Sequence, residues 1–174
     1  MFENDYNIVG KHATYVKYLA SEIKINNNTL FERYIDVYMN AAIFGLLYNR
    51  TAQKDSSNDR ARIYADAFAT CRSDCIFLYR LVMLLEKSAE ITPDERIDRA
   101  FRDDADEKKK DKLEANINLF HSYVLGGIEV LYEKYTDGCT TQEDYMERVY
   151  TLMSDFREEI QGISYGDKLK ELIG

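Results

Sequence analysis

The sequence contains few of the residues that interrupt or cross-link a polypeptide chain. Its 174 residues include one proline, no tryptophan and eight glycines, so the strongest breakers of helices are scarce. The longest apolar run, residues 41–48, is far shorter than the roughly 20 residues that a membrane-spanning helix needs. Residues 1–30 show no signal-peptide pattern, and the three cysteines are an odd number, which favours reduced thiols. These absences predict a cytoplasmic protein without a membrane segment.

The residue patterns of common catalytic and cofactor sites are also missing. No phosphate-binding Gly-x-x-x-x-Gly-Lys-Ser/Thr loop occurs, and neither His12 nor His121 ends the Glu-x-x-His motif of a di-iron site. Cys71 and Cys75 lie four residues apart, but no second short-spaced pair exists to complete a zinc site. The sequence therefore predicts no metal, no cofactor and no catalytic residue, and it favours a protein that is not an enzyme.

The balance of charge is acidic, because 31 Asp and Glu residues against 23 Lys and Arg residues give a net charge of −8. Such a charge opposes non-specific attraction to phosphate backbones and disfavours nucleic acid as a partner, although it leaves room for a local basic patch. The arginines that could contact phosphate or an acidic partner are Arg50, Arg60, Arg62, Arg99 and Arg102. Acidic residues surround the last two, so we favour a solvated, salt-linked surface there.

The residues that are present favour helices. Apolar side chains recur mostly three and four positions apart, as in amphipathic helices, and strand-like alternation is limited to residues 6–9. We therefore expect an all-α fold, a single domain over residues 1–174 built as an antiparallel bundle of five to seven helices. The helix expected at about residues 29–50 is apolar nearly all round in its second half, which places it at the centre of the bundle.

Start signals and periodicity set the expected bounds of the helices. Thr29 with Glu32 forms a capping-box pattern, in which each side chain satisfies the backbone N–H of the other. The same pattern recurs at Thr140, and a threonine followed by Pro93 marks another start. Helices are expected over residues 11–23, 29–50, 58–87, 113–135 and 164–173, with two more that open at Pro93 and Thr140. The charged residues 102–112 lack a large apolar anchor, and we expect a solvated helix end or a mobile connection there.

Two helices are expected to cross closely at glycines. Gly126 and Gly127 lie inside a predicted helix, where each costs about 1 kcal/mol relative to alanine. Such a cost is tolerable where another backbone packs closely, and Gly45 on the expected central helix is the natural counterpart. We favour this close crossing over a ligand-binding role for the glycine pair.

Polar residues on apolar helix faces suggest a buried seam. Asp74 falls in the apolar four-three row of the helix expected at 58–87, where a lone buried carboxylate would need a hydrogen-bond donor. Asp36 and Asn40 lie four residues apart on the expected central helix and could form a similar seam. With nearby tyrosines these three residues could line a small-molecule pocket. The alternative, which we favour, is a buried hydrogen-bond network that fixes the helix register.

Tyrosine is unusually frequent, with 14 in the chain, which exceeds what a bundle core of this size needs. Tyrosine combines a large contact area with a polar tip and is enriched at protein interfaces. Several tyrosines fall on the first two expected helices. The candidates for an interface there are Tyr15, Tyr18, Tyr34 and Tyr38.

Three functional hypotheses remain, each from a different class. The leading one is a non-catalytic helical module that acts through protein contacts, as a homodimer or as an accessory subunit of a larger assembly. The second is an accessory factor of a nucleic-acid-handling system, such as DNA modification or defence. The third is a small-molecule-binding sensor or enzyme that uses the polar seam.

Overall fold

The computed structural model describes residues 1–25, 27–87 and 90–162. Within these ranges the chain forms helices and two small antiparallel sheets, which confirms the expected all-α fold class. The helices are α1 (Lys11–Ser21), α2 (Tyr34–Leu47), α3 (Ala65–Thr70), α4 (Arg72–Leu85), α5 (Pro93–Phe101), α6 (Lys110–Thr136) and α7 (Gln142–Gly162). The strands are β1 (Tyr6–Val9), β2 (Lys24–Ile25), β3 (Asn28–Thr29) and β4 (Arg60–Ile63).

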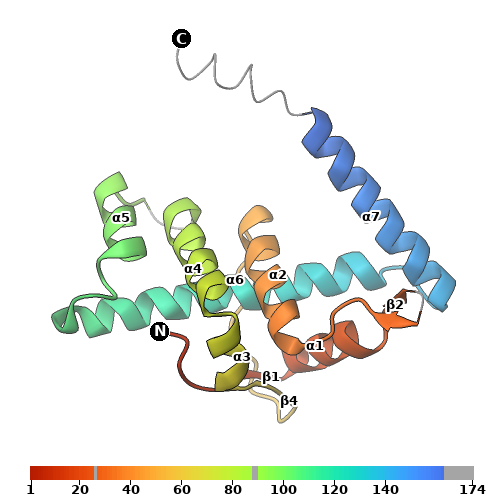
Figure 1. The fold of residues 1–174 in the computed structure, drawn as a ribbon, viewed down its shortest axis with the longest axis horizontal. Coiled ribbons are helices and arrows are strands. Elements are labelled where there is room, and N and C mark those ends of the chain that lie inside the picture. Colours follow the sequence, from red (N-terminus) through yellow and green to blue (C-terminus); the bar gives the residue numbers. More distant parts are fainter. Residues whose placement is uncertain (26, 88–89, 163–174) are drawn as a thin grey trace.

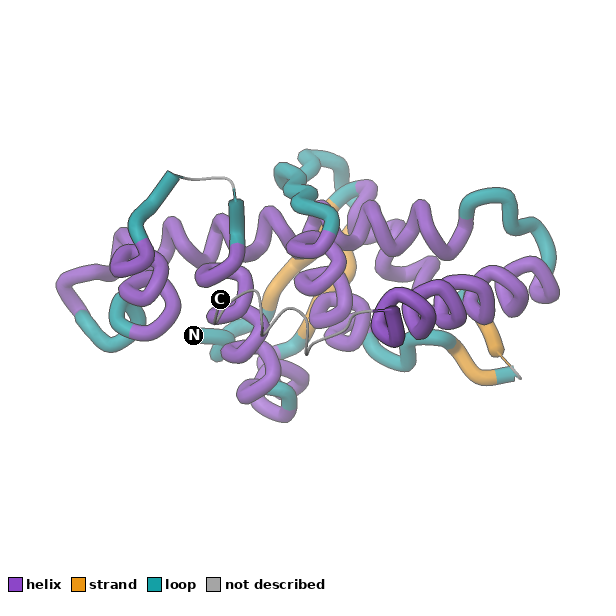
Figure 2. Tube along the Cα trace, turned by 90° about the horizontal axis from the view of Figure 1, so that it is seen from above, coloured by secondary structure: helices purple, strands orange, loops and turns teal. Residues whose placement is uncertain are grey.

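Helix α6 is the longest helix and the one on which the others assemble. Its 27 residues extend over about 40 Å, which is most of the length of the molecule (Figure 1, Figure 2). Helices α1, α2, α4, α5 and α7 all contact it, and α2 makes the most extensive contact. The centre of the fold is therefore the α2–α6 pair rather than α2 alone.

The α2 and α6 backbones meet at the three glycines that the sequence analysis paired. A Cβ atom on Gly127 would lie 1.8 Å from the carbonyl oxygen of Ala41, and one on Gly45 would lie 2.0 Å from that of Tyr123. A Cβ on Gly126 would lie 2.1 Å from the carbonyl oxygen of Arg50, just beyond the end of α2. No side chain fits at such distances, so the close crossing requires glycine at all three positions.

The core around this crossing is rich in aromatic rings. The fully buried rings are Tyr38, Phe68, Tyr79, Phe120 and Tyr123. The Tyr38 ring lies edge-on to Phe68 and Phe120, with centroid separations of 5.4 and 6.0 Å. Buried tyrosines reach polar partners at the edge of the core, since the hydroxyl of Tyr79 donates to the Arg99 carbonyl oxygen and that of Tyr123 donates to Asn49. Part of the tyrosine excess is therefore core packing.

The single helix expected over residues 58–87 is wrong. Residues 60–63 form strand β4, whose side chains are alternately exposed and buried and which pairs antiparallel with β1. Helices α3 and α4 follow, with a break at Cys71. Ile63, which lies inside the expected helix, is instead buried at the end of the strand, opposite Tyr6. Pairing with a strand more than fifty residues away in the sequence overrides the local helical preference of residues 60–63.

Helix α2 begins later and ends earlier than the expected range 29–50. Strands β2 and β3 form a tight hairpin before it, and Asn27 in the turn has a φ of 69°, which asparagine tolerates. Thr29 is therefore part of a strand, and the capping box expected for Thr29 and Glu32 is wrong. Asp36 instead accepts the backbone N–H of Arg33 at 3.0 Å, three residues earlier in the chain.

Two other helix starts follow their signals closely. The start expected at Pro93 is confirmed, and it is also a capping box, because the Thr92 hydroxyl accepts the N–H of Glu95 and the Glu95 carboxylate accepts the N–H of Thr92. At α7 the capping residues are Thr141 and Asp144, one residue later in the chain than expected. The helix expected over residues 164–173 lies outside the described residues.

The charged residues 102–112 contain a turn, a short 3-10 helix and the first residues of α6. Asp103 is buried within this segment and accepts hydrogen bonds from Asn116 at 3.1 Å and Lys109 at 3.0 Å. One acidic side chain therefore ties the connection to the body of α6.

Candidate functional site

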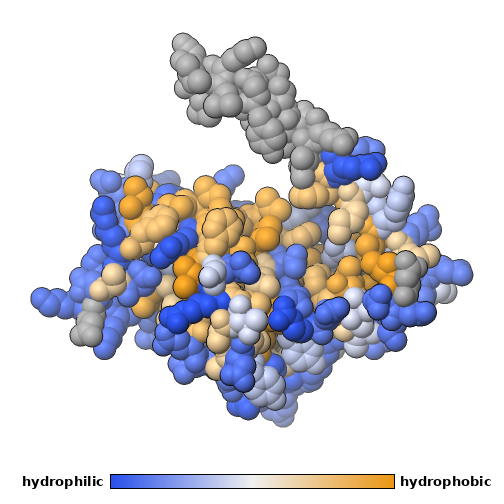
Figure 3. All heavy atoms as spheres, viewed as in Figure 1, coloured by the Kyte–Doolittle hydropathy of each residue, from blue (hydrophilic) through white to orange (hydrophobic). Residues whose placement is uncertain are grey.

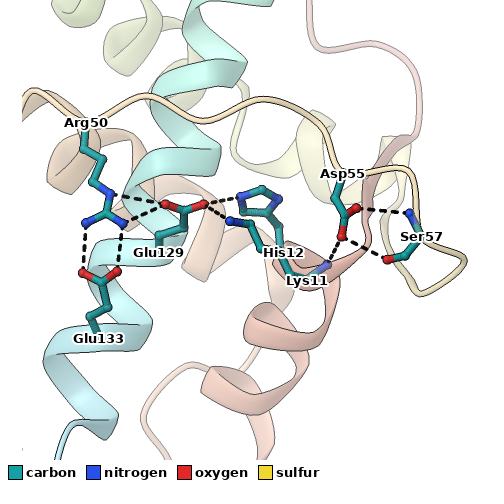
Figure 4. A network of polar contacts seen from close by, with 7 residues as sticks. All are labelled: Lys11, His12, Arg50, Asp55, Ser57, Glu129 and Glu133. Carbon is teal, nitrogen blue, oxygen red and sulfur yellow. Dashed lines mark hydrogen bonds and ion pairs between the residues drawn. The ribbon is translucent and has the colours of Figure 1, made fainter.

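The most extensive polar cluster surrounds Glu129 on α6 (Figure 4). Its Oε1 atom accepts from Lys11 Nζ at 2.7 Å and from His12 Nε2 at 3.0 Å, both at the start of α1. Its Oε2 atom accepts from Arg50 at 2.9 Å, and Arg50 also donates two hydrogen bonds of 2.8 and 3.0 Å to Glu133. One carboxylate thus joins α1, α6 and the segment that leaves α2.

The protonation states in this cluster follow from burial and pairing. Burial opposes ionisation of Glu129, whose side chain is 10% exposed, but hydrogen bonds from Lys11, Arg50 and His12 outweigh it and lower its pKa. Burial also lowers the pKa of His12, although the nearby carboxylate favours its charged form. The neutral imidazole donates its Nε2–H to Glu129, and its Nδ1 atom is buried without a hydrogen-bond partner among the described residues.

Asp55 closes the loop over the start of α1 beside this cluster (Figure 4). It accepts the backbone N–H of Lys11 at 2.8 Å and the hydroxyl of Ser57 at 3.0 Å. The bond from the Lys11 backbone is the main reason that the pKa of Asp55 falls to about 2. An ionised carboxylate at a helix start is the stabilising arrangement there.

A carboxylate beside an imidazole is also the pair that orients a general base, but the surroundings do not continue that pattern. A base would use Nδ1 of His12 to deprotonate a nucleophile, and this atom faces no hydroxyl or thiol group within hydrogen-bond distance in the described part of the chain. The Glu129 charge is already matched by Lys11 and Arg50. The geometry is that of a clamp between three segments. Periodicity in the sequence did not single out Glu129. The one sequence feature that could have indicated it is that an acidic residue stands within the otherwise apolar residues 123–131.

The second histidine is part of the aromatic core. The His121 ring stacks on Tyr6 with a centroid separation of 4.1 Å, and its Nε2 atom lies 3.1 Å from the Tyr38 hydroxyl. Burial lowers the pKa of His121 to about 3, so the ring is neutral at physiological pH. This residue packs and hydrogen-bonds inside the protein.

The residues of the expected polar seam do not form a buried pocket. Asp36 is half-buried at the start of α2, where Arg33 donates to both of its carboxylate oxygens. Asn40 donates to the Asp36 carbonyl oxygen at 2.9 Å within the same helix. Asp74 is exposed in the first turn of α4, so the buried position inferred for it is wrong. The break at Cys71 shifts the helical row that had placed Asp74 inside.

Four of the five candidate arginines are engaged by carboxylates within the protein. Arg50 binds the Glu129 cluster, Arg62 lies 3.4 Å from Asp5, and Arg102 lies 2.7 Å from Asp98. Arg99 binds the fully buried Glu86 at 3.1 Å, and Arg60 is exposed on β4. These ion pairs neutralise most of the positive charge that would attract a phosphate group.

The candidate interface tyrosines are mostly engaged as well. Tyr38 is fully buried, so the interface role expected for it is wrong. Tyr15 stacks on Tyr132 with centroids 3.9 Å apart, and the hydroxyl of Tyr18 hydrogen-bonds that of Tyr145. Tyr34 is half-buried and lines an open groove of about 640 Å³ between α1, α2 and β4. Tyr15 and Tyr18 connect α1 to α6 and α7 rather than forming a free surface.

Helix α7 carries an apolar surface that sequence reasoning did not single out. Tyr145 and Val149 are buried against the body and Leu152 is partly buried, whereas four large apolar side chains around and beyond them are exposed. The exposed residues, with their exposed fractions, are Met146 (45%), Tyr150 (73%), Met153 (55%) and Phe156 (55%). Figure 1 shows α7 leaving the end of α6 and extending away from the other helices. We call these four residues the α7 stripe.

A second exposed apolar surface lies on α2, α4 and α5, which stand side by side against α6 (Figure 1). Figure 3 shows hydrophobic residues gathering over this part of the molecule. Each helix contributes two large exposed side chains, namely Ile43 and Leu47, Phe77 and Leu85, and Ile97 and Phe101. We call these six residues the three-helix face.

Across the described ranges 1–25, 27–87 and 90–162 there is no group of three or more His, Cys, Asp and Glu side chains that could hold a metal ion. No helix there combines the length and apolar character needed to cross a bilayer. Comparisons with protein-family models, with curated protein sequences and with solved structures found no match to this chain.

Proposed function

We propose that this chain is a non-catalytic helical interaction module, a subunit that binds another protein through α7. The observation that carries the proposal is the α7 stripe: four large apolar side chains, each about half exposed or more, within eleven residues of one helix. A surface helix normally turns such residues toward a core. Here Tyr145 and Val149 already fill that role, and the stripe is additional.

The position of the stripe favours recognition of a protein. Single exposed apolar residues are common on monomers, but a contiguous exposed patch marks an interaction site. An amphipathic helix that binds through side chains at i, i+3, i+4 and i+7 is a common mode of protein recognition, and Met146, Tyr150 and Met153 have this spacing. Methionine and tyrosine are also enriched at interfaces.

The polar groups of the protein support this function better than the two alternatives. The Glu129 cluster is neutralised internally, which leaves no activated group for chemistry on a substrate. The arginines proposed for phosphate contacts mostly bind carboxylates of the same chain, and the net charge is −8. A role in nucleic-acid handling would therefore act through a protein partner.

A photo-crosslinking amino acid placed at Tyr150 of the full chain tests the proposal in the native host. The matched control is the same amino acid at Thr151, which is also exposed but faces away from the stripe. We expect discrete adducts of higher mass from position 150 and none from position 151. No adduct from either position, or the same adducts from both, would contradict an interaction through α7.

A further inference from the structure

We propose that the partner of α7 is a second copy of this chain, whose three-helix face receives the α7 stripe while its own α7 is received in return. The inference rests on the proposed function and names the partner. Each chain carries one donor helix and one acceptor face, and both present exposed apolar side chains within the part of the chain that the structure describes. A two-fold symmetric exchange covers all four surfaces at once and closes the assembly at two copies.

The outer side of α4 has the spacing needed to receive a helix. Its buried side chains face α2 and α6, while Phe77 is 64% exposed and Leu85, eight residues later, is 55% exposed. Leu81 and Leu84, half-buried, lie between them on the same side of the helix. This row continues over two helical turns, and α2 and α5 flank it with apolar side chains. Side chains at such spacing form the ridges between which a second helix packs.

The area available matches what a stable dimer needs. The stripe and the three-helix face comprise ten large side chains, most of them about half exposed. At roughly 100 Å² of exposed area each, they present on the order of 1,000 Å² of apolar surface per chain. Taken singly, the stripe presents about 400 Å² and the three-helix face about 600 Å², each within the range of about 300–600 Å² for the largest patch of a typical monomer, so this chain is distinguished by carrying two such surfaces. Covering both surfaces in two copies would bury about 2,000 Å², which is at the upper end of standard protein–protein interfaces.

Charge also distinguishes a second copy from an arbitrary apolar partner. Arg80 lies on the outer side of α4, with its guanidinium 5.1 Å from the centre of the Phe101 ring. The Arg80 side chain is half-buried and forms no ion pair with a described residue. A cation in this position is complementary to a partner that carries carboxylates.

Helix α7 of the other copy can supply carboxylates for Arg80. Its 21 residues include six acids and two arginines, so it is acidic overall. Glu143 and Glu147 are exposed and lie next to Met146 and Tyr150 on the helix surface, and neither forms an ion pair in the described part of the chain. Docking α7 on the partner would bring these carboxylates to Arg80 and its stripe to the apolar side chains around it.

Sedimentation velocity and light scattering on the full chain test the exchange. We expect the wild-type protein to have twice the 20.3 kDa mass of one chain. Met153→Glu on α7 and Phe77→Glu on α4 should each weaken association at least tenfold, while Thr151→Glu, on the polar side of α7, should leave it unchanged. All three positions are exposed, and circular dichroism should show the same helical content as in the wild type.

Mixing the two disrupted variants provides the decisive measurement. In a mixture of the two variants one contact stays intact. The Phe77→Glu chain still has an unmodified α7, and the Met153→Glu chain still has an unmodified three-helix face to receive it. We expect the mixture to form heterodimers at concentrations where each variant alone is monomeric. A mixture that stays monomeric, variants that still dimerise, or a monomeric wild-type protein would each overturn the exchange.

The crosslinking experiment separates this inference from the proposed function. A monomeric wild-type protein that still crosslinks to a different protein through Tyr150 would reject the second copy but keep the proposed function. A monomeric wild-type protein without adducts would reject both.

Discussion

The α2–α6 crossing and helix α7 are both rich in apolar residues, yet their surfaces are covered to very different degrees. At the crossing the two backbones are so close that no Cβ atom fits at Gly45, Gly126 or Gly127. On α7, Tyr150 is 73% exposed and Phe156 is 55% exposed. The first region is completed within one chain, whereas the second presents its apolar side chains outward.

This difference shows what apolar periodicity does and does not encode. Periodicity identifies a helix and its apolar side, but it does not say whether that side is covered by the same chain or by another. Glycine adds the missing information at the crossing, because it is unfavourable in a helix unless a close neighbour requires it. Helix α7 has no such signal before Gly162, and its apolar residues are instead mostly large.

The largest effect is expected at the crossing itself. Gly127→Ala would place a methyl group 1.8 Å from the Ala41 carbonyl oxygen, so one backbone must move. We expect a loss of about 4 kcal/mol or more in the free energy of unfolding, measured by urea denaturation. Ala115→Gly, at an exposed position of the same helix, is the matched control and should lose only about 1 kcal/mol. A Gly127→Ala protein as stable as the wild type would show that the α2–α6 crossing is not as closely packed as the structure has it.

The next largest effect is expected at the clamp beside the crossing. Glu129→Gln removes the negative charge that Lys11 and Arg50 share, and it leaves buried His12 with a weaker acceptor. We expect the free energy of unfolding to fall by about 2 kcal/mol, since both cations remain partly solvated. Glu133→Gln, whose side chain is 56% exposed, should change it by no more than about 0.5 kcal/mol. Equal effects of the two substitutions would show that burial does not set the strength of this cluster.

Lowering the pH should weaken the core through His121. Its pKa of about 3 in the folded protein lies below its ordinary value of 6.5 because the ring is buried. The unfolded chain therefore takes up a proton below pH 6.5 while the folded chain does not, and the stabilisation that is complete above pH 6.5 is lost as the pH falls toward 3. The expected loss from this residue is at most about 1.4 kcal/mol per pH unit. Denaturation of His121→Gln between pH 7 and pH 4 should show a shallower decline than the wild type; an unchanged slope would mean that His121 does not control it.

The smallest effect on folding is expected on α7. Phe156→Asp alters a ring that is 55% exposed, and the free energy of unfolding of the single chain should change by no more than about 0.5 kcal/mol. The matched core substitution, Phe120→Ala, removes a fully buried ring and should cost about 3–5 kcal/mol. A large loss from Phe156→Asp, measured at concentrations where the chain is monomeric, would mean that the stripe packs within its own chain.

The fold class and several helix starts were readable from local patterns, because these depend on neighbours within one or two turns. The threonine before Pro93 caps α5 as expected, and Gly127 of the glycine pair meets Gly45, while Gly126 packs against Arg50 just beyond α2. The segment 58–87 was misjudged because β4 forms only when β1, far away in the sequence, supplies a partner. Asp74 was misplaced for a different reason, because the break between α3 and α4 resets the helical row.

The sequence alone determined that this chain is helical, where most of its helices lie and which glycines must meet, because periodicity, caps and the helical penalty of glycine are local properties. Only the tertiary structure decided which polar groups are paired and which apolar groups are buried within the chain. It brings Lys11, His12 and Arg50 to Glu129, buries Tyr38 and leaves the α7 stripe exposed. The reason is physical: pairing and burial depend on which residues distant in the sequence come into contact, and no periodicity within one segment records that.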